Sequence, residues 1–104
     1  MSEERIIHVL GTPYTINNDH DTVTDRYGDC ERYAKEINIY LKSFEGEDTC
    51  KCVKKVINKT IRHELFHAIF HEAGLDEYSE DETLVDFLAI LYPKIQQIME
   101  SVSK

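Results

Sequence analysis

The eleven residues from Ile61 to His71, Ile-Arg-His-Glu-Leu-Phe-His-Ala-Ile-Phe-His, contain the pattern His-Glu-x-x-His at positions 63 to 67. Apolar residues recur here at the intervals of an amphipathic helix with one face in a core; they are Ile57, Ile61, Leu65, Ala68 and Ile69. Gly74 is placed to end such a helix. We therefore predict a helix over residues 50–73 on which the rest of the fold depends.

Helical geometry brings the two motif histidines together. Residues four apart lie about 40° apart around a helix and about 6 Å apart along it. His63 and His67 can therefore direct two imidazole nitrogens at one cation, while Glu64 beside them reaches a water near that cation. Two ligands, a base and an open position are the parts of a zinc hydrolase, so we predict one bound Zn²⁺, with Glu64 as the catalytic base. Because so short a motif also arises by chance, its context must supply a third ligand.

Composition limits the class of protein. A chain of 104 residues with 41% hydrophobic residues is expected to form one domain, residues 1–104. Its net charge of −8 argues against a nucleic-acid partner. We expect no signal peptide and no membrane span, because no apolar run approaches the roughly 18 residues that a span needs. Three cysteines cannot all pair, which favours a reduced, cytoplasmic protein.

Residues 1–42 carry the strand patterns. Arg5–Leu10 and Tyr14–Ile16 flank Gly11-Thr12 and predict a hairpin. A short third strand is predicted at Val23–Tyr27, followed by a turn at Gly28-Asp29, and Lys35–Leu41 alternates as a half-buried strand does. Strands followed by helices predict an α+β fold. We expect a small antiparallel or mixed sheet of three to four strands, packed by the helix at 50–73 and by a C-terminal helix at 80–101.

The C-terminal helix supplies the best candidate for the third ligand. Glu82 falls in its first turn and Asp86 one turn later on the same face. Glu82 can therefore bind the metal while Asp86 accepts the outer N–H of a ligand histidine. Ser79-Glu80-Asp81-Glu82 also has the pattern of a capping box, in which Glu82 would bond to the amide of Ser79 instead. The spacing leaves both roles open. His71 lies about 6 Å beyond His67 along the helix, too far to bind the same ion.

The order of these motifs resembles that of a known enzyme family. His63-Glu64-Leu65-Phe66-His67, followed fifteen residues after His67 by Glu82-Thr83-Leu84-Val85-Asp86-Phe87-Leu88-Ala89, resembles a minimal zinc metallopeptidase of the gluzincin kind. The chain is also similar to small phage- and prophage-encoded proteins with an LGTPYTI-like hairpin, an Ile-x-Ile strand and an RHELFHAIFHEAGL helix. Those proteins are related in pattern to the ImmA/IrrE metallopeptidases.

The resemblance implies a zincin-like fold and the cytoplasm of a bacterial host as the location. It also implies His63, His67 and Glu82 as zinc ligands, Glu64 as the base, and Asp86 as the support of a histidine. The chain departs from the family in offering no assured Tyr or His to stabilise the oxyanion. We nominate His71 and Tyr78 for that role.

Three functions are compatible with these patterns. The first is zinc-dependent hydrolysis of a peptide or protein substrate, which we expect to lie extended along the Lys35–Leu41 strand at a sheet edge. The second is a structural zinc held by Cys50, Cys52 and the motif histidines, although a continuous helix would separate Cys52 from His63 by about 16 Å. The third is a catalytically silent metal-binding module, of phage origin, that docks on a basic partner or inhibits it. The sequence does not indicate an oligomeric state.

Overall fold

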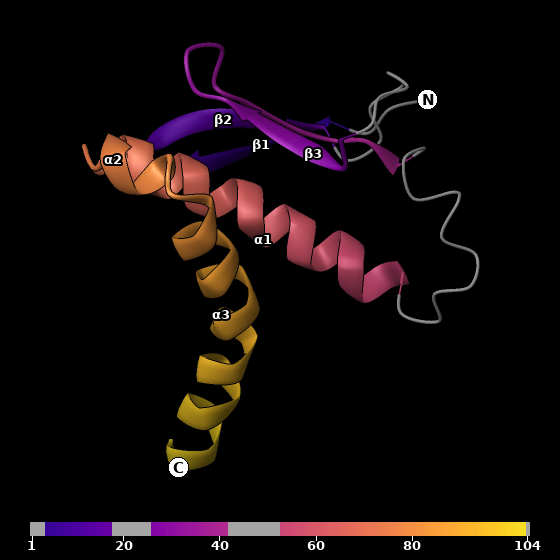
Figure 1. The fold of residues 1–104 in the computed structure, drawn as a ribbon, viewed down its shortest axis with the longest axis vertical. Helices are drawn as coiled ribbons and strands as arrows, with labels where there is room; N and C mark the ends of the chain where they lie inside the picture. The colour runs from indigo at the N-terminus through magenta and orange to yellow at the C-terminus, as the bar shows by residue number, and fades with distance from the viewer. Residues whose placement is uncertain (1–3, 18–25, 42–52, 104) are drawn as a thin grey trace.

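The computed structural model of the protein describes residues 4–17, 26–41 and 53–103. These ranges form a four-stranded mixed sheet and three helices, in the order β1-β2-β3-β4-α1-α2-α3 (Figure 1). The α+β class expected from the sequence is confirmed. None of the described helices is long and apolar enough to span a membrane.

The predicted hairpin is present as β1 (Glu4–Val9) and β2 (Thr12–Asn17), which pair antiparallel. Only two residues connect the strands, and both have positive φ, 49° at Leu10 and 89° at Gly11. Two positive φ angles in a two-residue loop are the signature of a type I′ turn, whose twist matches that of the flanking strands. Gly11 adopts this conformation without a steric penalty, and the turn starts one residue earlier than predicted.

The turn predicted at Gly28-Asp29 is wrong, and most of the strand predicted at Val23–Tyr27 falls outside the described residues. The structure has β3 at Gly28–Glu31, where a turn was expected, and the residues at 23–25 lie outside the described ranges. Glycine is in this strand because α1 passes very close to it. A Cβ atom on Gly28 would lie 3.0 Å from Cγ2 of Thr60 and 3.3 Å from Cγ of Glu64. Gly28 therefore marks a close approach of helix and strand, which a sequence pattern does not distinguish from a turn.

The strand order also corrects the predicted substrate strand. The sheet runs β1-β2-β4-β3, and β4 (Glu36–Ile39) pairs with β2 in parallel and with β3 antiparallel. The Lys35–Leu41 segment is therefore interior, and it cannot offer a free edge to a peptide. Its side chains alternate between the two faces of the sheet as predicted, but both sets are buried. Ile37 and Ile39 on one face are fully buried, and Asn38 on the other is 5% exposed. The edge strands of the described sheet are β1 and β3.

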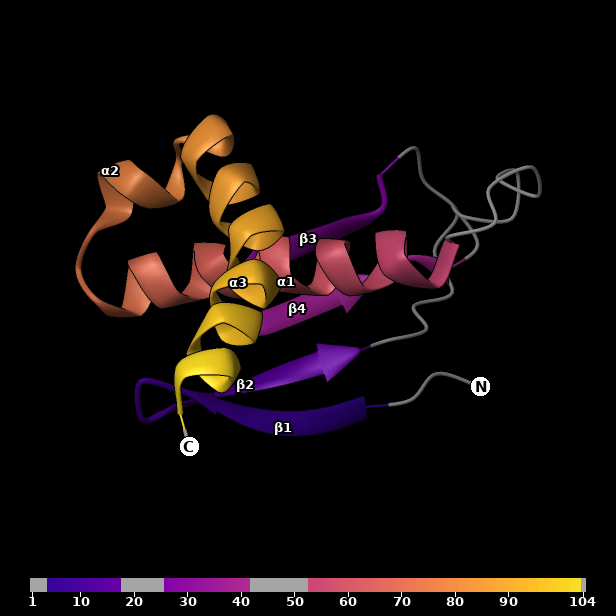
Figure 2. The same ribbon diagram turned by 90° about the horizontal axis from the view of Figure 1, so that it is seen from below.

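Helix α1 (Val53–Glu72) lies against one face of this sheet (Figure 2). The core lies between them and consists of Val9, Tyr14, Ile16, Ile37, Ile39 and Ala68, with Ile57, Ile61, Leu65 and Ile69 packed on it. The predicted apolar stripe of the helix is thus the stripe that packs on the core. Cys50 and Cys52, at the predicted start of the helix, lie outside the described residues.

The end of α1 is as predicted. Gly74 has a φ of 78°, its N–H donates to the carbonyl of His71, and the N–H of Leu75 donates to that of Phe70. This pair of bonds is the Schellman motif. The short helix α2 (Asp76–Ser79) follows, and α3 (Glu82–Val102) then crosses α1 and extends away from the sheet (Figure 1). The second predicted helix, 80–101, is therefore α3, preceded by one extra turn of helix.

The last residue of α1, Glu72, joins the helix to the sheet. Its carboxylate accepts hydrogen bonds from Thr12 Oγ1 at 2.8 Å, Tyr14 Oη at 2.7 Å and Lys35 Nζ at 2.7 Å. An acid at a helix C-terminus is unfavourable in the field of the helix dipole, so these contacts must compensate for it. They lower the pKa of Glu72 to about 2, the bond from Lys35 contributing most.

Glu72→Gln is expected to destabilise the fold by about 1.5–3 kcal/mol near pH 7, because bonds to a charged acceptor are lost. Since folding lowers the pKa of Glu72, its contribution is complete above the unfolded-state pKa of about 4.3 and is lost as the pH falls towards 2. Urea unfolding of both proteins at several pH values measures this. A cost to Glu72→Gln that does not shrink between pH 6 and pH 3 would contradict the assignment.

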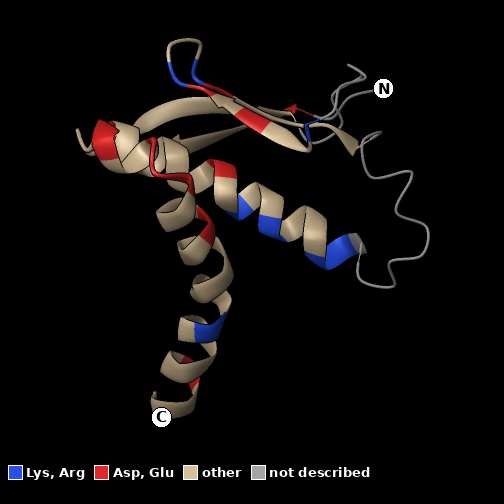
Figure 3. Cartoon of the chain, in the orientation of Figure 1, with Lys and Arg blue, Asp and Glu red and all other residues tan. Residues whose placement is uncertain are grey.

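Charge is distributed unevenly along α1 (Figure 3). Bases lie along its first part, and acids gather where α2 and α3 begin. The sequence has the same two runs: residues 51–62 hold five bases and no acid, and residues 72–82 hold six acids and no base. The fold places the last acid of this run, Glu82, beside His63 and His67, where negative charge favours a bound cation.

Candidate metal centre

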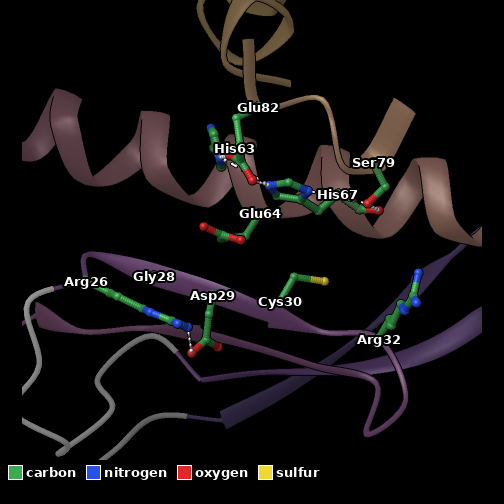
Figure 4. Close-up of a pocket in the computed structure, with 10 residues that line it drawn as sticks. All are labelled: Arg26, Gly28, Asp29, Cys30, Arg32, His63, Glu64, His67, Ser79 and Glu82. Carbon is green, nitrogen blue, oxygen red and sulfur yellow. Dashed lines mark hydrogen bonds and ion pairs between the residues drawn. The ribbon is translucent and has the colours of Figure 1, made fainter. Parts of the chain in front are cut away.

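A pocket of about 430 Å³ lies between α1, the edge strand β3 and the start of α3 (Figure 4). The helices contribute His63, Glu64, His67, Ser79 and Glu82, and the sheet side contributes Arg26, Gly28, Asp29, Cys30 and Arg32. The whole motif therefore lines one hollow, together with an acid from a different helix.

Three potential ligand atoms converge at the top of this pocket. Nε2 of His63 and Nε2 of His67 are 3.2 Å apart, and the two oxygens of the Glu82 carboxylate face one nitrogen each: Oε1 lies 2.9 Å from that of His63 and Oε2 lies 3.3 Å from that of His67. One ligand atom from each residue falls within a 4.8 Å group. Atoms that each lie 2.0–2.1 Å from one tetrahedral zinc are about 3.3–3.4 Å apart. The spacing of the three donors therefore fits a single small cation.

The outer nitrogens of the two rings have partners that indicate which tautomer each histidine adopts. Nδ1 of His63 lies 3.3 Å from the carboxylate of Asp86, which can only accept. Nδ1 of His67 lies 3.4 Å from Oγ of Ser79, whose own proton is donated to the carbonyl of His67 at 3.1 Å. Both bonds are long, and both favour a proton on Nδ1.

This arrangement leaves lone pairs directed at one point. With protons on both Nδ1 atoms, the Nε2 atoms of His63 and His67 face the Glu82 carboxylate, and none of the three groups has a proton to share. Such a set of acceptors is mutually repulsive unless a cation or additional protons lie among them. The chemistry of the donor set thus fits a metal ion, and two nitrogens with one carboxylate suit zinc.

Asp86 is itself held in its ionised form. Lys59 Nζ lies 3.0 Å from the same oxygen that faces His63. The hydrogen bond from Lys59 lowers the pKa of Asp86, with a smaller contribution from His63. The series Lys59–Asp86–His63 is the kind of outer support that fixes the ring of a metal ligand. The sequence predicted the contact of Asp86 with a motif histidine and missed Lys59, which lies one helical turn before His63.

The two open roles of Glu82 are distinguished by the start of α3. Asp81 is the N-cap residue, and its side chain accepts a hydrogen bond from the N–H of Leu84 at 3.1 Å. The alternative of a capping box from Ser79 to Glu82 is not present, because Ser79 ends α2 and its hydroxyl donates to the carbonyl of His67. Glu82 carries no capping function, and its carboxylate is directed at the two histidines.

Glu64 lies deeper than the three donors, between α1 and β3 (Figure 4). It is 7% exposed and makes no hydrogen bond to another described residue. Burial, and then the charges of Asp29 and Glu82, raise the pKa of Glu64 to about 8. Asp29 is anchored by Asn38 Nδ2 at 3.0 Å and by the hydroxyl of Tyr40. A cation beside Glu64 would favour its charged form.

Cys30 contributes a thiol to the same pocket from β3. Burial, and then the negative charges of Glu64 and Asp29, raise the pKa of Cys30 to about 12. The thiol is therefore neutral at physiological pH, and a neutral thiol is a poor metal ligand and a poor nucleophile. Cys30 also lies outside the group of His63, His67 and Glu82, whose ligand atoms are within 4.8 Å of one another.

The two residues nominated for the oxyanion do not line the pocket. Nδ1 of His71 lies 2.7 Å from the carboxylate of Asp76, and His71 does not belong to the group formed by His63, His67 and Glu82. Tyr78 is 48% exposed, and its ring packs on Phe70 at 5.9 Å. Both side chains make these contacts at the connection between α1 and α2, and not with the three converging donors.

The sequence missed several residues that shape the pocket. Gly28 allows α1 to approach β3, Asp29 and Cys30 form the opposite wall, and Ser79 supports His67. Ser79 was identified, but in a different role. The other three belong to β3, which begins where a turn was predicted, so no spacing within the chain linked them to His63.

Comparison of the chain with protein-family models, with curated proteins and with solved structures found no significant match.

Proposed function

We propose that this protein is a zinc-dependent metallopeptidase with a minimal zincin-like domain, in which His63, His67 and Glu82 hold one zinc ion. One observation carries the proposal: Nε2 of His63 and Nε2 of His67 lie 3.2 Å apart, and each lies within 3.3 Å of one oxygen of the Glu82 carboxylate, in the same pocket as Glu64. Two neutral imidazoles, one carboxylate and a neighbouring second carboxylate are the side chains that such an enzyme requires.

Zinc held there would supply Lewis acidity, which polarises a carbonyl group and makes a water acidic near neutral pH. The protein supplies the rest. Glu64 accepts a proton from the attacking water and then donates it to the departing amine. Its buried position between helix and strand excludes bulk water, so that proton stays with the reacting atoms. Asp86 and Ser79 keep the two rings oriented while this occurs.

The strand that we propose for substrate binding is β3. This edge strand of the described sheet forms a wall of the pocket with Gly28, Asp29 and Cys30. A peptide in extended conformation can pair with an exposed edge strand through its main chain, which gives affinity with little demand on sequence. We propose β3, in place of Lys35–Leu41, as the strand along which the substrate lies.

A silent metal-binding module is the second candidate, and one observation favours it. Neither His71 nor Tyr78 lines the pocket, so the nominated donors for the oxyanion are absent from it. A protein of this kind would bind metal and a partner without turnover. Cys50 and Cys52, on which the alternative structural zinc site depends, lie outside the described residues.

Metal analysis tests the proposal most directly. Protein purified without added zinc is expected to contain about one zinc per chain, and to lose peptide hydrolysis on chelation and regain it on addition of zinc. Bound zinc without hydrolysis of any member of a random peptide library would favour the silent module. If the protein contained no zinc, both as purified and after incubation with the ion, the metallopeptidase and the silent metal-binding module would both be contradicted.

A further inference from the structure

We propose that Arg62 is a positioning residue that fixes α3 on α1 by donating to a backbone carbonyl left without its helical partner by Pro93. The consequence of this bond would be the placement of Glu82 and Asp86 against the motif histidines. The importance of that placement for zinc binding rests on the proposed function.

The first step is the chemistry of Pro93. This residue lies inside α3, near the middle of Glu82–Val102. Proline has no N–H, so the carbonyl four residues before it cannot accept its usual helical hydrogen bond. That carbonyl belongs to Ala89. Ala89 is 0% exposed, so water cannot serve as a substitute donor. A buried carbonyl without a donor is costly, so a partner is required from elsewhere in the molecule.

The second step is the partner. Nε of Arg62, on α1, donates to the Ala89 carbonyl at 2.7 Å. Among the residues that the structure describes, Arg62 forms no ion pair with an acid, although acids are numerous. The hydrogen bond to the Ala89 carbonyl is therefore the main polar contact of its guanidinium among the described residues. A short bond from a charged donor to a buried acceptor belongs to the stronger class of hydrogen bonds.

The third step is where this bond lies. Arg62 immediately precedes His63, and Ala89 lies one turn after Asp86 and two turns after Glu82 on the other helix. Val85 and Ala89, both 0% exposed, are the buried residues of α3. The bond therefore fixes the position of α3 along α1 at a point one residue from His63 on α1 and two turns from Glu82 on α3. The Glu82 side chain is 68% exposed and has little packing of its own to hold it.

A double-mutant cycle tests this mechanism. Arg62→Met removes the donor and keeps most of the apolar stem, and Pro93→Ala returns an N–H to the carbonyl of Ala89. Arg62→Met is expected to weaken zinc binding about tenfold when Pro93 is present, as the loss of outer support for ligands does. In the Pro93→Ala background, Arg62→Met should weaken zinc binding by less than about threefold, because the carbonyl of Ala89 is then bonded within its own helix.

The matched control is Lys54→Met, which removes one positive charge from an exposed position on the same helix. It should leave zinc affinity within about twofold in either background. Zinc affinity is measured by competition with a chromophoric chelator, and stability without metal by urea unfolding. The urea midpoint should fall on Arg62→Met, and should fall less with Ala at position 93.

Equal losses from Arg62→Met in the two backgrounds would overturn the inference, as would failure of the Arg62→Met, Pro93→Ala double variant to fold. If the wild type binds no zinc but the urea midpoints still show the coupling, the zinc proposal fails while the helix–helix bond stands. If zinc binds and the losses are additive, the zinc proposal stands and the role of Arg62 is wrong.

Discussion

Replacing Glu64 by Gln is expected to reduce peptide hydrolysis by about 10²–10⁴-fold, the usual contribution of a positioned general base. Gln has the shape of Glu and cannot accept the proton of an attacking water. Glu64 is not one of the three converging donors, so its replacement should leave the zinc content at that of the wild type. The measurement is hydrolysis of a fluorogenic peptide library, with zinc content determined on the same samples.

The control for this variant is Glu77→Gln. Glu77 is an exposed acid of α2 that does not line the pocket, and its replacement removes the same charge. Hydrolysis should be unchanged in this variant. Cleavage that is equal in wild type, Glu64→Gln and Glu77→Gln would remove Glu64 from the mechanism, and would point to a contaminating protease if chelation also had no effect.

Glu82→Ala is expected to weaken zinc binding by more than about a hundredfold, because even the loss of outer supports of a metal site costs 10–100-fold. The effect can be measured through stability. With free zinc at 100 times the wild-type dissociation constant, binding stabilises the wild type by about 2.7 kcal/mol. A variant with a hundredfold weaker site would gain only about 0.4 kcal/mol at the same zinc concentration.

Urea unfolding with and without zinc measures both values. Glu80→Ala is the matched control, since Glu80 is an exposed acid two residues earlier and lies outside the donor group. It should be stabilised by zinc as much as the wild type is. Full stabilisation of Glu82→Ala would show that Glu82 is not a ligand. If Cys50→Ser and Cys52→Ser together then abolished zinc binding, the cysteine site would be favoured instead.

Local patterns in the sequence predicted the two long helices, α1 and α3, and the first hairpin. The apolar stripe from Ile57 to Ile69 required one helix, and Gly74 ended it where expected. The interval of four between His63 and His67 placed two nitrogens side by side, because a single helix determines that distance. No tertiary contact is needed for these features, so the amino-acid order was sufficient.

Contacts between distant residues were less predictable. Glu82 had two possible roles of equal standing, and the choice depended on Asp81 being the N-cap of α3, which frees the Glu82 carboxylate. The substrate strand was wrong because strand order is not sequence order: β4 lies between β2 and β3. Lys59 and Arg62 appeared only as members of a basic run, although each has a specific partner on α3.

The sequence by itself determined the helical register of His63, Glu64 and His67 and the α+β class, since both follow from periodicities within continuous segments. Only the tertiary structure decided which acid meets the histidines, which strand forms the wall of the pocket, and why Gly28 and Pro93 occupy their positions. These depend on how closely α1 approaches β3 and α3. Such distances are set by the packing of whole elements, so no local pattern encodes them.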